Sequence, residues 1–531
     1  MTSYNLPFNE INILSPLISD YINRVAQVKA FTHDTPNTDL LIKLAESRQN
    51  FSSAHRETLV NVLKEQYRKL PSSEAVTRNI NLLREEQTFT ITTGHQLNLA
   101  TGPIYFVYKI LNAINMAEEM NKADKSRQYV PVFWMATEDH DFEEINHCKL
   151  FNETYQWKTK AGNATGRLKL QADIDEVMEQ FNKKLGDFDE GNVLIDLLHQ
   201  AYKESENLAD ATQKLTHALF GKYGLVVLNP DDRRLKKLFA PIMLDELMNR
   251  PTQAIVQRTS DTLNDGGYKI QAHVRDINLF LLDDNLRKRI SKQGSDYELI
   301  GDSDILNGQE LLNQLERSPE KFSPNVILRP VYQESILPNI CYIGGGGELA
   351  YWMQLKPLFS HFKVPYPALQ LRNMVLLTEP HHQEKLEKLR LDVFDLNQDF
   401  HVLSNHWIKM HAEHEISLQE EKKQLQQIYQ QIADKAAQID QTMVPAVEGS
   451  EKGQLKALDG LEKKLVKAEK RQHDISLSQM QRLQDDLFPN GNLQERSVNV
   501  FEFLAKYRLA FIDELKKQLT AFPDSFQVIK L

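Results

Sequence analysis

The apolar and polar positions in the first third of the chain follow a strand, loop, helix and strand pattern. Residues 87–93 (QTFTITT) alternate threonine with apolar side chains, which is typical of a strand. Residues 101–120 place apolar side chains along one helical face, with Thr101 as the expected N-cap. Residues 129–136 (YVPVFWMA) are an apolar run of strand length. This order predicts a βαβ unit and therefore a parallel sheet.

The same alternation continues along the chain. A predicted strand at 223–230 precedes a predicted helix that starts on Asp231 or Asp232, and an apolar strand precedes four glycines and a further helix. A last strand is expected at 366–373. We therefore predict an α/β fold with a doubly wound parallel-sheet core. The expected bounds are a core over 1–380, a helical lead-in over 1–85, and insertions near 150–220 and 250–325, the second with short antiparallel strands.

Beyond residue 380 the pattern changes to heptads. Apolar residues recur every seven positions, and a second stripe has 3-4 spacing; these stripes are Leu418, Leu425, Ile432 and Ile439, then Leu458, Leu461, Leu465, Ala468, Gln472 and Ile475. Residues 444–453, with one proline and two glycines, are the expected break between two helices. The pattern predicts an antiparallel coiled-coil arm over 381–490, about 50 Å long. Residues 491–531 are expected to form a helix packing on the core.

A long amphipathic arm cannot bury its own apolar stripe fully. We therefore expect the arm to dock on another subunit and to form a homodimer; the alternative is that it packs along its own core.

Composition narrows the class of protein. The 531 residues carry a net charge of −10 and have no run of apolar residues long enough to span a bilayer. No concentrated basic surface is apparent, so neither nucleic acid nor a membrane is an expected partner. The two cysteines, Cys148 and Cys341, form no CxxC pattern, and the N-terminus has no signal-peptide pattern. We expect a cytoplasmic protein.

Three polar loops follow predicted strands, where ligands bind in open parallel sheets. In the first, residues 92–103 (TTGHQLNLATGP), a histidine comes directly before a helix, where the phosphates of a nucleotide would approach. The alternative is that Gly94 and His95 merely form a tight turn. The candidates for binding are His95, Gln96, Asn98, Thr101 and, on the following helix, Lys109, for which exposure to solvent is the alternative.

The second loop, residues 137–147 (TEDHDFEEINH), is dense in carboxylates. Asp141 and Glu144 have the spacing of a capping pair at a helix start. Glu138, Asp139 and His140 remain as candidates for positioning a polar substrate or for proton transfer. The spacing of the histidines matches no zinc motif and HExxH is absent, so no metal is expected.

The third loop is the glycine turn Gly344–Gly347 with Glu348. It fits neither the Walker A nor the GxGxxG pattern, but it lets a ligand approach backbone amides at a helix start. The polar residues Arg329, Gln333 and Glu334 interrupt the preceding apolar segment. They indicate a cleft, with a buried ion pair as the alternative.

Four segments in this order resemble the cysteine-adding enzymes of bacillithiol biosynthesis, and the resemblance extends over essentially the full length. These segments are TTGHQLNLATGPIYFVYKI, VPVFWMATEDHDFEEINH, NVILRPVYQESILPNICYIGGGGELAYW and LQERSVNV. The resemblance implies a Rossmann-like core with connecting insertions and a coiled-coil domain that mediates dimers. It also implies a ligase that forms a carbon–nitrogen bond, adding L-cysteine to glucosaminyl-malate in the last step towards the low-molecular-weight thiol bacillithiol.

Amide formation needs an activated carboxyl group, so ATP or another nucleotide is the expected cofactor. His95 and Gln96 would contact its phosphates or the activated carboxyl, Arg329 would pair with a carboxylate, and the glycine turn would supply amides. Class I synthetases that adenylate an amino acid carry HIGH where this chain has GHQL, and no KMSKS-like loop is present. Two alternatives remain, a non-catalytic scaffold for the pathway and a metal-dependent hydrolase.

Overall fold

The computed structural model describes residues 1–48, 51–160, 164–283, 287–301, 305–411 and 417–531. They form two compact units by their internal contacts. The larger unit comprises Met1–Val375 and Glu495–Ile529, and the smaller comprises Leu376–Gln494 with Lys530–Leu531. Within these ranges, no helix has both the length and the apolar character needed to cross a membrane.

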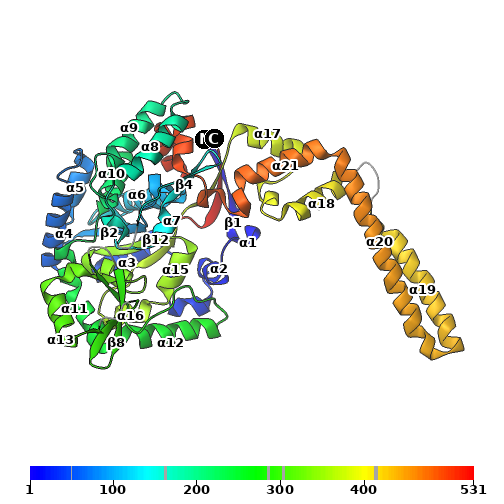
Figure 1. The fold of residues 1–531 in the computed structure, drawn as a ribbon, viewed down its shortest axis with the longest axis horizontal. Helices are drawn as coiled ribbons and strands as arrows, with labels where there is room; N and C mark the ends of the chain where they lie inside the picture. Colours follow the sequence, from blue (N-terminus) through cyan, green and yellow to red (C-terminus); the bar gives the residue numbers. More distant parts are fainter. Residues whose placement is uncertain (49–50, 161–163, 284–286, 302–304, 412–416) are drawn as a thin grey trace. The chain divides into compact units, whose positions relative to one another are not determined.

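The larger unit is built on a five-stranded sheet with the order β13-β12-β2-β3-β6, in which all neighbours are parallel (Figure 1). Its strands are β2 (Thr88–His95), β3 (Gln128–Met135), β6 (Val226–Leu228), β12 (Asn339–Gly344) and β13 (Ala368–Leu371). The first strand, β2, lies in the middle. The chain adds β3 and β6 on one side and β12 and β13 on the other, so the order reverses between β2 and β12. This confirms the predicted Rossmann-like sheet and places its topological switch point there.

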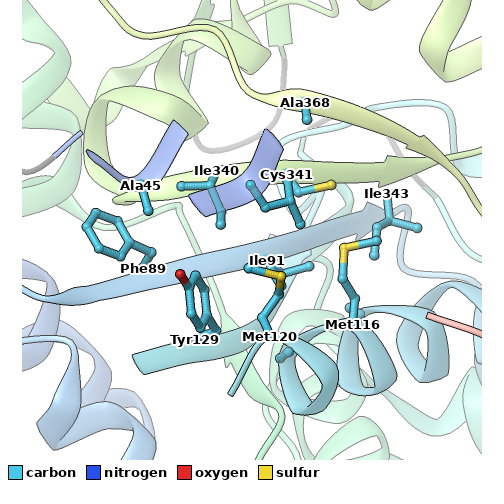
Figure 2. Close-up of a cluster of buried hydrophobic side chains, with 13 residues drawn as sticks. Ala45, Phe89, Ile91, Met116, Met120, Tyr129, Ile340, Cys341, Ile343 and Ala368 are labelled. Atoms are coloured by element: carbon cyan, nitrogen blue, oxygen red, sulfur yellow. The ribbon is translucent and has the colours of Figure 1, made fainter. Parts of the chain in front are cut away.

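The sheet is buried because apolar side chains cover it and its polar side chains bond within it. Phe89 and Ile91 of β2 pack in a cluster with Met116 and Met120 of α6 (Tyr105–Ala123) and with Ile340 of β12 (Figure 2). The threonines of β2 are buried as well. The hydroxyls of Thr90 and Thr92 lie 3.2 and 2.8 Å from the side-chain oxygen of Asn339 on the neighbouring strand. A threonine-rich strand can therefore occupy the centre of the sheet.

The predicted helical lead-in begins with a strand. β1 (Thr2–Pro7) is a neighbour of β15 (Ser525–Lys530), so the two ends of the chain pair in a small sheet. The helices that follow are α1 (Phe8–Ile11), α2 (Pro16–Ile22), α3 (Thr38–Ser47), α4 (Ser53–Gln66) and α5 (Glu74–Leu82).

Two insertions interrupt the strand and helix alternation. The first contains α7 (Phe142–Ile145), the hairpin β4 (His147–Leu150) and β5 (Glu153–Gln156), and the helices α8 (Ala172–Leu185), α9 (Gly191–Tyr202) and α10 (Leu208–Phe220). The second follows α11 (Arg233–Asn249) and α12 (Pro251–Asp265). It is an antiparallel sheet in the order β10-β9-β8-β7-β11, as predicted, with α13 inserted. Its bounds are β7 (Leu279–Leu282), β8 (Arg287–Gln293), β9 (Asp296–Leu299), β10 (Ile305–Leu306), α13 (Gly308–Arg317) and β11 (Phe322–Pro324).

The remaining helices of the larger unit fall in two groups. Three of them precede or follow β12 along the chain, and two come after residue 495. They are α14 (Arg329–Ile336), α15 (Gly346–Met353), α16 (Lys356–His361), α22 (Val500–Tyr507) and α23 (Ala510–Gln518). Residues beyond 491 therefore form two helices and a strand rather than the single helix expected from the sequence.

Two predicted helix starts are wrong. Asp141 makes no capping hydrogen bond with its side chain, and α7 has only four residues because the chain turns into β4 at His147. Thr101 does not cap α6, whose N-cap residue is Ile104. The φ angle of Thr101 is +70°, in the left-handed region, so the backbone there cannot lead directly into a helix.

The smaller unit is helical, with α17 (Pro380–Leu389), α18 (Phe400–His411), α19 (Gln419–Ile439), α20 (Val444–Gln472), α21 (Asp474–Leu487) and the strand residues after Val375 in β14 (Met374–Thr378). Helices α19 and α20 pack side by side as an antiparallel pair (Figure 1). Lys422 near the start of α19 lies 2.6 Å from Glu462 and 2.7 Å from Asp459 in the second half of α20. This confirms the predicted coiled-coil hairpin.

The predicted break at 444–453 is wrong. These residues form the start of α20, and the turn lies before them at Gln441–Met443, where Asp440 caps with its side chain. The proline falls in the first turn of the helix, where its missing N–H costs nothing. The two glycines cost about 1 kcal/mol each in a helix interior, which a long packed helix tolerates.

Candidate functional site

A cleft lies at the switch point of the parallel sheet. It is a cavity of about 340 Å³ lined by the residues that follow β2, by the glycine turn after β12, and by side chains of α6 and α14. Arg372 and Arg496 complete the lining. All these residues belong to the larger unit. Cavities of this size at a switch point are the usual ligand sites of open α/β sheets.

Lys109 crosses the switch point. Its ammonium lies 2.5 Å from the carbonyl oxygen of Gly94, at the end of β2, and 2.7 Å from the carboxylate of Glu348 in α15. Burial lowers the pKa of Lys109, while Glu348 opposes this shift. Lys109 is only 3% exposed, so the alternative that it faces solvent is wrong. The ion pair joins the two sides of the switch point.

Glu348 is partly buried, with 30% of its side chain exposed, and it stays ionised. Burial favours its neutral acid, but Lys109, the amide of Gly345 and the hydroxyl of Tyr342 together hold the pKa of Glu348 below its ordinary value. The Gly345 N–H and the Tyr342 O–H each donate to its carboxylate over 2.8 Å. Glu348 is therefore a fixed part of the glycine turn.

His95 lies at the end of β2 and faces the cavity. Its ring stacks on Tyr105, with centroids 5.1 Å apart and planes 13° apart. Burial, with Lys109 nearby, lowers the pKa of His95 to about 3. Its Nε2 atom makes no hydrogen bond to the described residues. The imidazole is therefore neutral at physiological pH, and its buried Nε2 atom has no hydrogen-bond partner among the described residues.

The other candidates of the first loop lie in different places. Gln96 lines the cavity and donates to the carboxylate of Glu144 over 2.9 Å. Asn98 lines a smaller neighbouring cavity instead. Thr101 is buried and lines neither cavity. The loop thus supplies His95 and Gln96 to the main site.

Asp139 and Arg329 form the opposite edge of the site. Their side chains lie 3.3 Å apart, and both line the cavity. Burial favours the neutral form of Asp139, but Arg329, His140 and Arg287 hold the pKa of its carboxyl far below the ordinary value. Arg329 remains charged because the nearby carboxylates outweigh its burial and raise its pKa.

His140 is half exposed and does not line the cavity. Its Nδ1 atom lies 2.9 Å from a guanidinium nitrogen of Arg287 in β8. The ligand atoms of Asp139, His140 and Asp141 lie within 4.8 Å of one another, close enough to hold a metal ion. The guanidinium groups of Arg287 and Arg329 contact the same cluster, and their charge disfavours a cation there. The arrangement favours charge pairing over metal binding.

Glu138 is buried beside Lys236, away from the cavity lining. Lys236 is 1% exposed and also lies 3.2 Å from Asp231. This buried network anchors the end of β3 to the start of α11. A catalytic role for Glu138 stays a prediction, and its position favours a structural one.

Of the polar residues before β12, one lines the cavity and another is buried in an ion pair. Gln333 lines the cavity, whereas Glu334 is fully buried 3.2 Å from the guanidinium of Arg48. Burial raises the pKa of Glu334 to about 7, and Arg48 opposes that shift. The buried ion pair that the sequence left open as an alternative is therefore present. Of the predicted glycine cradle, Gly345, Gly346 and Gly347 line the cavity, while Gly344 ends β12 and does not.

Two arginines of the site were missed by the sequence reasoning. Arg372 follows β13 and pairs with Glu495 through both of its terminal nitrogens, at 2.9 and 2.6 Å. Its guanidinium also lies 4.9 Å from the ring centre of Tyr105. Arg496 is exposed and forms no ion pair with the residues described. Arg372 fell inside the strand predicted at 366–373, so the rule that ligands bind after parallel strands did not select it; the strand itself ends at Leu371.

The comparisons with known proteins agree over the whole length. Residues 1–373 match the family described as "Bacillithiol biosynthesis BshC, N-terminal Rossmann-like domain", and residues 375–531 match "Bacillithiol biosynthesis BshC, C-terminal coiled-coil domain". Three curated relatives carry the name "Putative cysteine ligase BshC". One, from Christiangramia forsetii, is 38% identical and covers 99% of this chain and 98% of its own length.

The other two relatives come from the genus Flavobacterium. The protein of Flavobacterium johnsoniae is 39% identical over 97% of each chain. That of Flavobacterium psychrophilum is 39% identical over 99% of each chain. The chain therefore belongs to the bacillithiol biosynthesis BshC family.

Proposed function

We propose that this protein is a ligase that joins the carboxyl group of L-cysteine to the amine of glucosaminyl-malate, the last step of bacillithiol synthesis. The observation that carries the proposal is the cavity at the switch point, whose lining combines cations, backbone amides and a neutral histidine. Family membership supports it, because the relatives carry the name of a cysteine ligase. Both proposed substrates bear carboxylates, so the site must be able to hold negative charge.

The charge of the lining meets that requirement. Its cations are Lys109, Arg329, Arg372 and Arg496, whereas its carboxylates are Asp139 and Glu348. The histidine adds no charge because its pKa is so low. Lys109, Arg329 and Arg372 each have a carboxylate partner, in Glu348, Asp139 and Glu495. Among the described residues Arg496 is therefore the cation of the lining without an ion pair, and it attracts carboxylate or phosphate oxygens.

The reaction places defined demands on these groups. The amine nitrogen, without its extra proton, attacks the carboxyl carbon; a C–N bond forms, and the C–O bond to the leaving group breaks. Negative charge collects on the carbonyl oxygen meanwhile, and fixed donors stabilise it. The first amides of α15 point out of the helix end, and the glycines that carry them line the cavity. These are the donors we assign to that oxygen.

We assign Asp139 to binding the amine of glucosaminyl-malate. Its carboxylate remains ionised because Arg329 lies beside it, so it attracts an ammonium group and orients it. A carboxylate with a pKa this low is a weak base. We therefore give Asp139 a positioning role and let solvent take the proton.

We also propose ATP or another nucleotide as the activating cofactor. Arg496 and the amides of the glycine turn are suited to phosphate oxygens, whereas Glu348 repels them and limits how close they approach. When bound, the nucleotide would supply the phosphoryl or nucleotidyl group that makes a carboxyl oxygen a good leaving group. The residues of the cavity would bind and orient it.

The test uses the purified full chain with glucosaminyl-malate, cysteine and each candidate nucleotide in turn. We expect a product with the mass of the two substrates less one water, formed only when both substrates and one nucleotide are present. The nucleotide product, a diphosphate or a monophosphate, identifies the activation chemistry. Absence of this product with every nucleotide, from protein that is folded, contradicts the proposal and favours the scaffold alternative. Elemental analysis of the purified, active protein tests the expectation that the protein itself holds no metal, and a stoichiometric zinc or manganese content contradicts it.

A further inference from the structure

A buried glutamine presents its side-chain oxygen to the proposed active site. Gln333 is 3% exposed and lines the cavity from α14. Its Nε2 atom donates to the carboxylate of Glu334 over 2.9 Å. Its Oε1 atom accepts no hydrogen bond from the described residues, and the protein does not enclose it. The hydrogen-bond acceptor of this amide is therefore open to a ligand in the cavity.

The amide of Gln333 cannot be reversed without losing hydrogen bonds. The carboxylate that it contacts also accepts from Asn339 over 2.8 Å and from the guanidinium of Arg48 over 3.2 Å. Asn339 is held in turn, because its oxygen lies 3.2 and 2.8 Å from the hydroxyls of Thr90 and Thr92. A carboxylate surrounded by three donors accepts from each, so a reversed Gln333 would place oxygen against oxygen. The side chain therefore offers the cavity an acceptor.

The surroundings of Gln333 favour a positively charged donor. Its nitrogen lies on a carboxylate, and hydrogen bonding at that end increases the negative charge on Oε1. Arg329, one turn earlier in α14, does not cancel this charge because Asp139 pairs with it over 3.3 Å. Hydrogen bonds from charged donors are about twice as strong as those from neutral donors. An ammonium group is therefore the ligand group that gains most from this acceptor.

A second amide of the lining provides a comparison. Gln96 also donates with its nitrogen to a carboxylate, that of Glu144. That hydrogen bond is exposed, so water competes with a ligand there. Gln333 is held by a buried network, and its oxygen gains more from a ligand that replaces water.

We propose that Gln333 binds the α-ammonium group of cysteine and thereby selects this substrate. The assignment rests on the proposed function, which places the carboxyl group of cysteine in the same cavity. The ammonium is one carbon away from that carboxyl group, so it needs an acceptor there. Asp139 is assigned to the amine of the other substrate, and the carboxylate of Glu348 is already bonded to Lys109 and Tyr342. Gln333 supplies the acceptor.

This contact also decides which of two amines reacts. Cysteine and glucosaminyl-malate each carry an amine, and only that of glucosaminyl-malate must attack. An acceptor bonded to the ammonium of cysteine favours its protonated form, which has no lone pair for attack. Gln333 therefore prevents one cysteine from being joined to another.

The test compares the binding of two ligands by calorimetry. They are L-cysteine and 3-mercaptopropionate, which has the same thiol and carboxylate but no ammonium. The pH is 7.5, above the pKa of Glu334, which burial raises to about 7. For Gln333→Met we expect cysteine to bind roughly tenfold more weakly, the typical loss for a hydrogen bond to a charged group. The same variant should bind 3-mercaptopropionate as the wild type does.

Gln213→Met is the matched control. Gln213 is a buried glutamine of α10 that does not line the cavity, so this variant also loses a buried amide. It should bind both ligands as the wild type does. Urea unfolding should show that both variants are folded, because Gln333→Met leaves the pair of Glu334 and Arg48 in place.

The two ligands separate the proposal from its alternatives. Equal weakening for both ligands means that Gln333 only shapes the cavity, and this overturns the proposal. Unchanged cysteine binding by Gln333→Met, with a loss in Gln96→Met instead, places the ammonium at the other amide and also overturns it. So does a folded wild type that binds cysteine no better than 3-mercaptopropionate, or that binds no cysteine with or without glucosaminyl-malate.

Steady-state kinetics separate this proposal from the proposed function. In Gln333→Met the KM for cysteine should rise roughly tenfold while the KM for glucosaminyl-malate stays unchanged. The opposite pattern assigns Gln333 to the other substrate and overturns the proposal. Cysteine binding that depends on Gln333, without amide formation by the wild type, leaves the ammonium site standing and removes the ligase proposal. Amide formation with a KM for cysteine that is indifferent to Gln333 does the reverse.

Discussion

The ammonium of Lys109 lies 2.7 Å from the carboxylate of Glu348, and this partly buried pair joins the two sides of the topological switch point. Lys109 belongs to the helix after the first strand, and Glu348 to the helix after the glycine turn. The same ammonium donates a hydrogen bond to the carbonyl oxygen of Gly94 near the end of β2. The pair therefore sets the width of the cavity and fixes the glycine turn.

Replacing Lys109 with methionine should abolish most of the activity. The substitution keeps the length of the side chain but leaves the carboxylate of Glu348 without its cation. Breaking a fully buried pair costs about 3–5 kcal/mol, and this pair should cost less because Glu348 is 30% exposed. We expect kcat/KM to fall at least about a hundredfold, because groups that position a reaction lose effect when displaced by about 1 Å. Steady-state kinetics with cysteine and glucosaminyl-malate measure this.

Lys122→Met is the matched control for that variant. Lys122 lies on the same helix, but its side chain is 71% exposed, so its ion pair with Glu119 is screened by water. It should keep the wild-type rate. Equal rates for Lys109→Met and Lys122→Met would show that the partly buried pair has no part in the site.

His95 should not control the pH dependence of the reaction. Its pKa is lowered to about 3, because burial disfavours the charged imidazole, so it stays neutral as pH varies from about 5.5 to 8. We expect His95→Gln to lower kcat/KM without changing the shape of the pH profile. A wild-type inflection near the ordinary histidine value of about 6.5 that disappears in His95→Gln would contradict this assignment.

Arg48 and Glu334 form a buried ion pair whose loss should be costly. Their side chains are 3% and 0% exposed, and Arg48 also donates to backbone carbonyls of Glu334 and Leu337. Arg48→Ala should lower the free energy of unfolding by about 3–5 kcal/mol. Urea unfolding followed by tryptophan fluorescence measures the change.

An exposed pair provides the contrast. Lys69 and Glu206 lie 3.2 Å apart, but their side chains are 83% and 79% exposed. Lys69→Ala should therefore cost less than about 1 kcal/mol. Similar costs for Arg48→Ala and Lys69→Ala would mean that burial of the first pair does not decide its energy.

The coiled-coil arm should mediate a homodimer. Within the hairpin Leu425 and Leu458 are partly buried, but Ile432 and Leu465 remain 43% and 42% exposed, and Ile439 is 87% exposed. One hairpin thus covers only part of its apolar stripe, and a second copy with the same stripe can cover the rest. Changing both Ile432 and Leu465 to lysine should convert a dimer to a monomer in sedimentation velocity.

Gln431→Lys adds a charge next to that stripe on a polar position of the same helix, where its side chain is exposed. It should leave the dimer intact. A wild-type monomer, or a dimer that survives the double substitution, would show that the arm does not associate through this face.

The sequence was sufficient to predict the parallel sheet and the coiled-coil arm. Both rest on long periodic patterns: the buried strands read as apolar runs, and the heptads repeat over many turns. It was less informative at single residues. The start of α20 read as a break because proline and glycine are usually turn residues, yet the proline falls in the first helical turn.

Only part of the site could be predicted from the sequence, and the reason is physical. A polar residue after a strand has the same local pattern whether it lines a cavity or pairs inside the protein. His95 and Asp139 face the cavity, whereas Glu138 and Glu334 pair with the buried cations Lys236 and Arg48, which lie far away in sequence. No local pattern reveals a partner that distant, so the ion pairs became visible only in the structure.

Hydrogen exchange with and without substrates tests most directly whether the switch point is the site. With glucosaminyl-malate and cysteine bound, backbone amides at residues 94–102 and 344–353 should exchange more slowly, because the ligands bind to those amides and stabilise the loops. Amides in α19 should exchange as in the free protein. Slower exchange in both loops, but not in α19, is the result we predict. Unchanged exchange in both loops, with protection elsewhere in the chain, would contradict the assignment of this cavity as the active site.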